Sequence, residues 1–300
     1  MGRISMFILC GFILISILFH GHASTSSTQE KKDMITSQKQ QTLNYLKRLL
    51  RKRSVETTTD EFPWHVFIPL LRCSGVLIHS RFVITSASCL SRSPSNLPPS
   101  ALLVRVGNHH FNLEAPGEDT IPVLHVLTFP NHNSKASIGN IAVLYLAREL
   151  IRAGILRRSP DQFLRLPRGY GSLLKLGLKA KVVGWGHSGT ASPLSTLHYD
   201  SATISSLQLC NSSYKGEPLN GDLLCVHNAS SSLCSVDGGS PVIAQDEDGS
   251  WILLGVFAWG KTCEVFPKPV IFTRINPSVI RWLKKLFRVK GTFMISCQFF

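Results

Sequence analysis

Apolar residues occur along most of this chain in short runs that are separated by Gly, Pro, Ser and Asn. Short runs bounded by turn-forming residues are typical of β-strands. Many such strands in succession predict an all-β protein built as a sandwich or a barrel. The runs lie at residues 64–70, 75–78, 102–106, 121–127, 142–146, 181–185, 251–257 and 270–273.

The C-terminal region has a different pattern. Val279, Ile280 and Leu283 recur at helical spacing, which places them on one side of a helix. Pro277 stands at the first turn, where the missing N–H of proline costs no hydrogen bond. We therefore predict a C-terminal α-helix over residues 277–289.

At the N-terminus, an apolar run over residues 4–19 follows Arg3, and the small residues of Gly21-His22-Ala23 come after it. This order is typical of a secretory signal peptide. The run is shorter than the roughly 20 apolar residues that cross a bilayer. We predict a signal peptide over residues 1–23, an extracellular protein and no transmembrane span.

The next segment is polar and basic. Residues 24–41 are rich in Ser, Thr, Gln and Lys, so they can bury too little apolar surface to fold, and we expect them to be disordered. Lys52-Arg53 is a candidate site of dibasic cleavage, and an uncut linker is the equal alternative. The predicted organisation is a disordered, basic pro-segment or linker over residues 24–53, a main domain over 54–289 and a tail over 290–300.

The formal net charge of +14 is divided evenly along the chain. Residues 1–53 hold nine Lys or Arg against two acids (+7), and the remaining residues hold 23 against 16 (+7). Half of the positive charge therefore lies in a segment that cleavage would remove. Basic residues also gather in the predicted main domain at Arg157, Arg158, Arg281, Lys284, Lys285 and Arg288, with Lys290 in the predicted tail.

Eight cysteines are present, and Cys10 lies in the predicted signal peptide. An exported protein meets an oxidising compartment, where disulfides persist. The other seven allow three bridges and one odd thiol. No pair has the C-x-x-C spacing of a zinc site, so we expect no metal and no cofactor. Asn211 and Asn228 stand in glycosylation sequons.

Several motifs together resemble the trypsin/chymotrypsin-like serine proteases, peptidase family S1. The resemblance extends over about residues 60–285 and implies two six-stranded antiparallel β-barrels with a C-terminal helix. The motifs are Phe62-Pro63-Trp64, Cys73-Ser74-Gly75, Thr85-Ser86-Ala87-Ser88-Cys89, Asn140-Ile141-Ala142, Gly184-Trp185-Gly186, Cys234-Ser235-Val236-Asp237-Gly238-Gly239-Ser240-Pro241, Trp259-Gly260 and Lys268-Pro269-Val270.

The resemblance also implies a disulfide pattern. The family bridges correspond to Cys73–Cys89, Cys210–Cys225 and Cys234–Cys263, which leaves Cys297 as the odd thiol. A further family bridge is missing at both of its ends, where Ala180 and Ala244 stand. Loss of both partners is expected for two positions that are in contact.

The catalytic positions implied by the resemblance hold other residues. Ser88 stands where the family has its histidine, Asn140 where it has aspartate and Gly238 where it has the serine nucleophile. Val236 replaces a glycine of the oxyanion hole, and we expect a β-branched residue there to re-aim the backbone donor. Acyl transfer needs a nucleophile, a base and a group that orients the base. We therefore expect a catalytically inactive homologue, a pseudoenzyme.

The specificity pocket is altered in the same way. Ser232 stands at its base, Ala258 and Trp259 precede the surviving Gly260, and Val270 replaces a second glycine. Methyl groups in a slot built around glycine obstruct a long side chain. We expect a shallow or closed pocket.

Residual endopeptidase activity with displaced groups is one alternative. Ser240 would be the nucleophile, with His79 or His187 as the base. Asp237 matches the aspartate that pairs with the freed N-terminus in active relatives, but Ser54-Val55-Glu56-Thr57 does not resemble that N-terminus. Two interpretations of Asp237 stay open: a carboxylate bound by backbone amides, and a preserved switch.

We expect the chain to act by protein–protein binding, for example as a decoy or regulator of an active protease. The Pro-Ser-Asn-Leu-Pro-Pro run at residues 94–99 predicts an enlarged surface loop that could carry the interface. The other alternative is a basic protein of antimicrobial type that binds heparin or a similar polyanion through the basic residues above. We expect no nucleic-acid partner.

Overall fold

The computed structural model describes residues 32–41, 54–58, 61–94, 97–110, 118–133, 138–150, 162–168, 174–186, 195–214, 219–228, 234, 236–262 and 268–290. The chain divides into two compact units, residues 1–50 and 51–300. In the first unit, residues 32–41 form a helix whose side chains are all exposed. This helix lies in the segment for which we expected disorder. The predicted signal peptide lies outside the described residues, and none of the helices within them is long and apolar enough to cross a membrane.

Six antiparallel strands of the second unit close into a first barrel in the order β2-β3-β4-β7-β6-β5. Short helices interrupt the chain between them. The elements are β2 (His65–Ile68), η1 (Pro69–Leu71), β3 (Cys73–His79), β4 (Phe82–Thr85), α3 (Ala87–Leu90), η2 (Pro99–Ala101), β5 (Leu103–Val106), β6 (Asp119–Thr128) and β7 (Ala142–Leu146).

A second barrel follows in the order β9-β10-β13-β12-β11-β8, and it closes because β8 also pairs with β9. The strand β1 (Val55–Glu56) pairs with the first two residues of β9, His198 and Tyr199. The elements are β8 (Lys179–Gly184), β9 (His198–Ser205), α4 (Leu207–Ser213), β10 (Leu223–His227), β11 (Pro241–Gln245), β12 (Trp251–Gly260), β13 (Val270–Arg274) and α5 (Pro277–Lys290).

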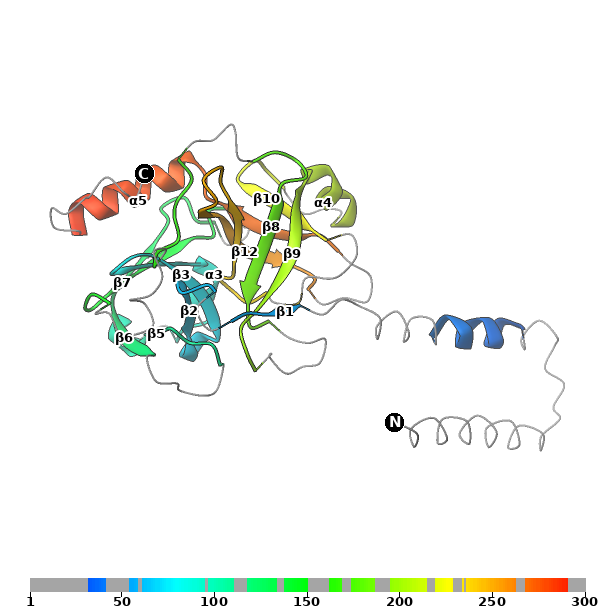
Figure 1. Cartoon of the computed structure of the whole chain (residues 1–300), viewed down its shortest axis with the longest axis horizontal. Helices are drawn as coiled ribbons and strands as arrows, with labels where there is room; N and C mark the ends of the chain where they lie inside the picture. The colour runs from blue at the N-terminus through cyan, green and yellow to red at the C-terminus, as the bar shows by residue number, and fades with distance from the viewer. Residues whose placement is uncertain are drawn as a thin grey trace, which may run out of the picture. The chain divides into compact units, whose positions relative to one another are not determined.

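This architecture confirms the fold that the resemblance implies, namely two six-stranded antiparallel barrels and a C-terminal helix (Figure 1). The predicted helix over 277–289 corresponds to α5. Its apolar face joins the first barrel, because Val279 and Leu283 are fully buried in the same core cluster as the strands of that barrel.

Strand alternation divides the core between the two barrels. In β8, Val182 packs inside the second barrel, whereas its neighbour Val183 belongs to the cluster that includes the first. Trp64 and Trp185 are fully buried in that larger cluster. Consecutive side chains of a strand point to opposite faces, so one strand can contribute to both cores. The loops that hold the catalytic positions of the family therefore begin and end on a rigid frame.

Candidate functional site

Two of the three catalytic positions are brought together by strand pairing in the first barrel. The last residue of β4, Thr85, is paired with Ala142, the first residue of β7. Ser88 follows β4 in the short helix α3, and Asn140 immediately precedes Ile141 and β7. The register of two strands thus fixes the relative position of both side chains.

Ser88 and Asn140 bind each other. The side-chain oxygen of Asn140 accepts from the backbone N–H of Ser88 at 2.7 Å, and its amide nitrogen donates to the Ser88 hydroxyl at 3.0 Å. The Ser88 hydroxyl donates in turn to Ser86 at 3.3 Å. Asn140 is 4% exposed, so this amide fills a buried position with both of its polar atoms paired.

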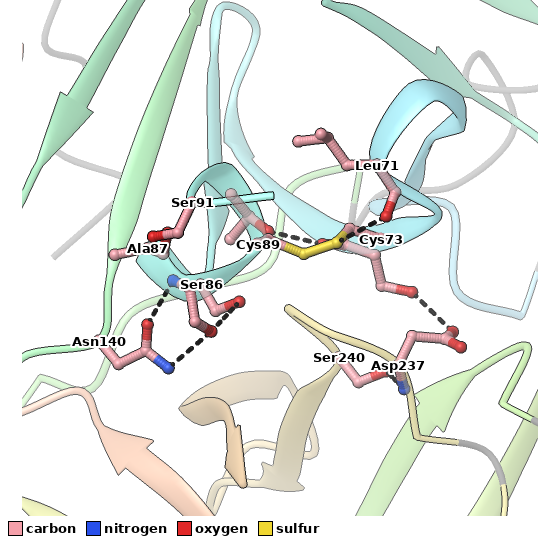
Figure 2. The surroundings of a disulfide bond; sticks show 12 residues. Leu71, Cys73, Ser86, Ala87, Cys89, Ser91, Asn140, Asp237 and Ser240 are labelled. Atoms are coloured by element: carbon pink, nitrogen blue, oxygen red, sulfur yellow. Dashed lines mark hydrogen bonds between the residues drawn. A yellow bond between two sulfur atoms is a disulfide. The ribbon is translucent and has the colours of Figure 1, made fainter. Parts of the chain in front are cut away.

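Gly238 lies directly against the Cys73–Cys89 disulfide. Its carbonyl accepts from the backbone N–H of Ser74 at 2.8 Å, which joins the loop to β3. A Cβ atom built on Gly238 would lie 2.8 Å from the sulfur of Cys89 and 3.2 Å from that of Cys73. Figure 2 shows Asn140 on one side of this disulfide and Asp237 on the other. A side chain at position 238 would require the neighbouring sulfur atoms to move.

The Asp237 carboxylate is held by groups from two other parts of the chain, strand β3 and the segment that follows β8. One carboxylate oxygen accepts from the Ser74 hydroxyl at 3.0 Å and from the backbone N–H of Trp185 at 2.8 Å. The other accepts from the backbone N–H of Gly186 at 2.9 Å. Of the two interpretations of Asp237 that the sequence left open, this geometry matches a carboxylate bound by backbone amides.

The Ser74 hydroxyl links Asp237 to a histidine that the sequence analysis did not select. The Nε2 atom of His65 lies 3.2 Å from the Ser74 hydroxyl oxygen. Ser74 is completely buried and His65 is 2% exposed. The only signal in the sequence was a polar residue inside the apolar run at 64–70. Sequence reasoning therefore missed a chain of contacts from Asp237 through Ser74 to His65, in which the serine and the histidine are buried.

This chain of contacts contains an imidazole near a hydroxyl, but in an order that does not match a catalytic triad. Complete burial lowers the pKa of His65 to about 3, because desolvation disfavours the charged imidazolium. The Ser74 hydroxyl donates its proton to Asp237. In a catalytic triad the hydroxyl instead gives its proton to the imidazole. A poor base beside a hydroxyl that no substrate reaches is suited to a structural role.

Of the displaced groups considered above, the two that the structure describes, Ser240 and His79, have different partners. The Ser240 hydroxyl accepts from the backbone N–H of Asp237 at 2.8 Å, and Ser240 is completely buried. His79 lies at the end of β3, where its ring stacks against Phe163 and Phe287. His187 lies outside the described residues.

Val236 and Val270 are buried in one apolar cluster inside the second barrel. Among the described non-glycine residues, only Arg72 has a positive φ, so Val236 keeps an ordinary backbone conformation. Val270 is paired with Gly260, which has a φ of 142°. A Cβ on that glycine would lie 3.3 Å from a methyl carbon of Val270. The valine side chain therefore packs against the strand that corresponds to the pocket wall.

The remaining pocket positions are only partly described. Ala258 and Trp259 are partly buried, and the ring of Trp259 contacts Tyr214 edge-on at 5.0 Å. The Tyr214 hydroxyl donates to the carbonyl of Pro269 at 2.6 Å, at the start of β13. Ser232 lies outside the described residues. In the described part, Tyr214 thus contacts both Trp259 and the segment that leads into β13.

The structure contains two of the predicted disulfides, Cys73–Cys89 and Cys210–Cys225. Cys234 is also disulfide-bonded, whereas Cys263 and Cys297 lie outside the described residues. Val242 is paired with Val182 and Ile243 with Lys181. In this antiparallel register the next residues are Ala244 and Ala180, and both belong to the core cluster of the second barrel. The two alanines therefore stand opposite each other, as expected for the lost bridge.

The two sequons lie in different environments. Asn211 is exposed on α4. Asn228 is partly buried, and its side-chain nitrogen donates to the carbonyl of Ser201 at 2.7 Å. Glycosylation attaches to that nitrogen, so Asn211 is the more accessible acceptor. No group of three His, Cys, Asp or Glu side chains in the described ranges is arranged to hold a metal ion.

The sequence matches known proteins over most of the region that forms the barrels. A family model described as Trypsin matches residues 52–283. Cationic trypsin-3 of Rattus norvegicus is 28% identical over 218 residues, which covers 71% of this chain and 78% of the relative. Trypsin of Sus scrofa is 27% identical over 218 residues, with 71% and 84% covered. A protein described as hepatocyte growth factor activator serine proteases, from Canis lupus familiaris, is 26% identical over 230 residues, with 74% and 34% covered. With these matches and the two barrels, the chain belongs to the trypsin-like S1 serine protease family.

Proposed function

We propose that this chain is a secreted, catalytically inactive member of the family that acts by binding another protein. The observation that carries the proposal is the set of residues at the three catalytic positions. Ser88, Asn140 and Gly238 offer a hydroxyl, an amide and no side chain, and the first two are bound to each other. None of the three can accept a proton near neutral pH.

The expected loss of rate is large. In serine proteases, removal of the catalytic triad costs about 10⁶-fold in turnover. Loss of one oxyanion donor costs a further 10²–10³-fold, roughly. Val236 and Val270 are buried in one cluster of the second barrel. Val236 stands at the oxyanion position and Val270 on the wall of the pocket, so both positions support the proposal that catalysis is absent.

Peptidase assays test the absence of catalysis. The purified chain, with and without cleavage after Arg53, should hydrolyse no peptide from a mixed-sequence library. It should also not react with a fluorophosphonate probe that labels a control trypsin. Turnover that disappears in Ser240→Ala would overturn the proposal and support the displaced nucleophile instead.

Binding is proposed to use loops on the rigid barrels. Between α3 and β5, the chain forms a surface segment in which Pro99, Ser100 and Ala101 are exposed. Leu103 is 40% exposed at the start of β5, and Leu124 of β6 is 45% exposed. Leu103 is paired with Pro122, so it lies diagonally across from Leu124 on the outer face of the sheet.

Cross-linking mass spectrometry of the full chain with proteins from the fluid that contains it tests this interface. Cross-links should involve the segment at residues 94–101, and replacement of that segment by a short Gly-Ser linker should remove them. A matched replacement of residues 246–249, the exposed turn between β11 and β12, should leave the partner bound. Equal recovery of the partner by both variants would exclude the loop as the interface.

A further inference from the structure

We propose that the surface beside Gly238 binds a carboxylate side chain of a partner protein, and that Arg92 selects it. The Nη1 atom of Arg92 lies 4.0 Å from the position that a Cβ atom on Gly238 would take. A positive charge therefore lies next to the position at which the family has its nucleophile. The proposal rests on the proposed function, because it names the chemistry of the partner that the domain would bind.

The Cys73–Cys89 disulfide fixes the relative position of the two loops that form this surface. Arg92 follows α3, and its backbone N–H donates to the carbonyl of Cys89 at 3.2 Å. The Gly238 carbonyl accepts from the backbone N–H of Ser74, the residue after Cys73. Figure 2 shows α3 at the Cys89 end of this bond. Both loops are anchored to the same covalent bond, so their backbones are held close together.

The surface can be reached from the solvent. Arg92 and Ser88 are exposed, and Gly238 is partly exposed. The two sulfur atoms of the disulfide lie 2.8 Å and 3.2 Å from the Cβ position of Gly238, so a ligand would lie against the guanidinium and the glycine backbone rather than at that position. Close approach of another molecule to the backbone is one use of a glycine.

The positive charge of Arg92 has no counter-ion within the described part of the chain. No ion pair and no side-chain hydrogen bond of Arg92 occurs there. The carboxylate of Asp237, the neighbour of Gly238, is engaged by the Ser74 hydroxyl and by two backbone N–H groups that follow β8. The guanidinium therefore keeps its N–H donors for an external carboxylate, which it can bind through two parallel hydrogen bonds.

Gly238 supplies a second donor. Its carbonyl is paired with Ser74, but its own N–H donates to no group among the hydrogen bonds of the described loops. A backbone N–H without a partner in the protein is satisfied by water or by a ligand. A carboxylate has about four lone-pair positions on its two oxygens, so it can accept from more than one donor. The guanidinium and this N–H both favour an anion.

A carboxylate matches these groups better than other charged ligands do. Proteins that recognise phosphorylated or densely acidic motifs generally use a cluster of arginines, whereas the charged side chain against this position is a single arginine. A basic side chain of a partner would meet a like charge, which suppresses its binding. An acidic side chain, Asp or Glu, is therefore the ligand that the described groups favour.

Peptide selection on the full chain tests the site. Peptides from a displayed random library that bind the immobilised chain should contain Asp or Glu, and replacement of that acid by Asn or Gln should weaken binding by about 10–100-fold. The same replacement should have little effect on binding to Arg92→Ala, since the opposite charge is already absent. Arg92→Lys should keep part of the affinity, because an ammonium group lacks the bidentate geometry.

Arg168→Ala is the matched control. Arg168 is exposed in the segment before β8, so its loss changes the net charge equally and should leave peptide affinity unchanged. Thermal unfolding should show that both variants are folded. Equal loss of affinity in Arg92→Ala and Arg168→Ala would overturn the proposal. So would selection of peptides that bind through no acidic residue, or a selection that yields no binding peptide.

The outcomes separate this inference from the proposed function. Tight binding of peptides that lack acids would contradict the role of Arg92 but support a binding protein, whereas turnover in the peptidase assays would contradict the proposed function. Replacement of the acid in a selected peptide by phosphoserine should not improve binding. A clear gain in affinity would assign the site to phosphopeptides and overturn the choice of a carboxylate.

Discussion

The space around Gly238 is too small for a side chain. Because a Cβ would lie 2.8 Å from the sulfur of Cys89, Gly238→Ser should destabilise the protein by about 1–3 kcal/mol, as overpacking does. It should also give no peptidase activity, since Ser88 stands where the family has its histidine. Chemical denaturation measures the loss. Gly221→Ser is the matched control, because nothing lies within 4 Å of its Cβ position.

A double-mutant cycle tests whether the disulfide is the cause. In the Cys73→Ala/Cys89→Ala background, Gly238→Ser should cost clearly less than in the wild-type chain. Equal costs in both backgrounds would show that the strain arises elsewhere. The disulfide variant itself should lose about 3 kcal/mol, the value expected for a loop of this length.

His65 should make stability depend on pH. Burial lowers the pKa of His65 from 6.5 to about 3, so below pH 6.5 the unfolded chain binds a proton that the folded chain excludes. Stability should therefore fall as pH falls between about 6.5 and 3, by on the order of 2 kcal/mol between pH 6.5 and 5.

Denaturation at several pH values checks this, with His65→Gln as the comparison. Burial also lowers the pKa values of His79, His109 and His227. These three histidines should therefore also lower the stability of the protein as pH falls. The difference between the wild-type chain and His65→Gln isolates the contribution of His65. Parallel curves for the two proteins would contradict the assignment.

At the level of elements, the apolar runs predicted eight strands but missed β1, β4, β9, β10 and β11. The strand β9 reads His-Tyr-Asp-Ser-Ala-Thr-Ile-Ser, and only three of its eight residues are buried. Its polar residues gave no apolar run. It forms because β8 and β10 pair with its two edges, which is information that no local window of sequence contains.

For the candidate site, the sequence predicted the positions of the residues but not their contacts. The order of the family motifs located Ser88, Asn140 and Gly238, because each of these residues lies within one of the motifs. The partners of Asp237 could not be predicted, since Ser74 is 163 residues away in sequence and Trp185 is 52 away. Contacts between the loop and two different barrels exist only in the folded chain.

The hydrogen bond from Ser74 should contribute to stability. A hydrogen bond to a charged group is worth about 1.5–3 kcal/mol, so Ser74→Ala should lower the free energy of unfolding by roughly that amount. Ser212→Ala removes an exposed hydroxyl that donates to a backbone carbonyl and should cost much less. Similar losses of unfolding free energy in the two variants would show that the hydrogen bond from Ser74 to Asp237 stabilises the protein no more than an exposed hydrogen bond does.

For the whole molecule, the hydrogen bonds of Asp237 and the pairing of β1 predict that cleavage after Arg53 does not change the conformation of the domain. Asp237 already accepts three hydrogen bonds, and Val55 and Glu56 pair with β9. Cleavage after Arg53 should therefore leave the unfolding temperature and hydrogen-exchange protection of residues 236–240 unchanged. Lys52→Ala/Arg53→Ala supplies the uncleaved reference. Stabilisation by cleavage would indicate that the new amine displaces Ser74.

The contact between Gly238 and the disulfide also bears on how such a protein could change over generations. If the chain is the inactive homologue that we propose, a mutation that introduced a hydroxyl at this position would impair folding before it could bring any benefit, because a base and its orienting carboxylate would still have to be acquired. Selection would remove such intermediates unless the sulfur atoms had moved first. One steric contact thus limits the order in which the residues of a catalytic site could be acquired, and it favours retention of glycine at position 238.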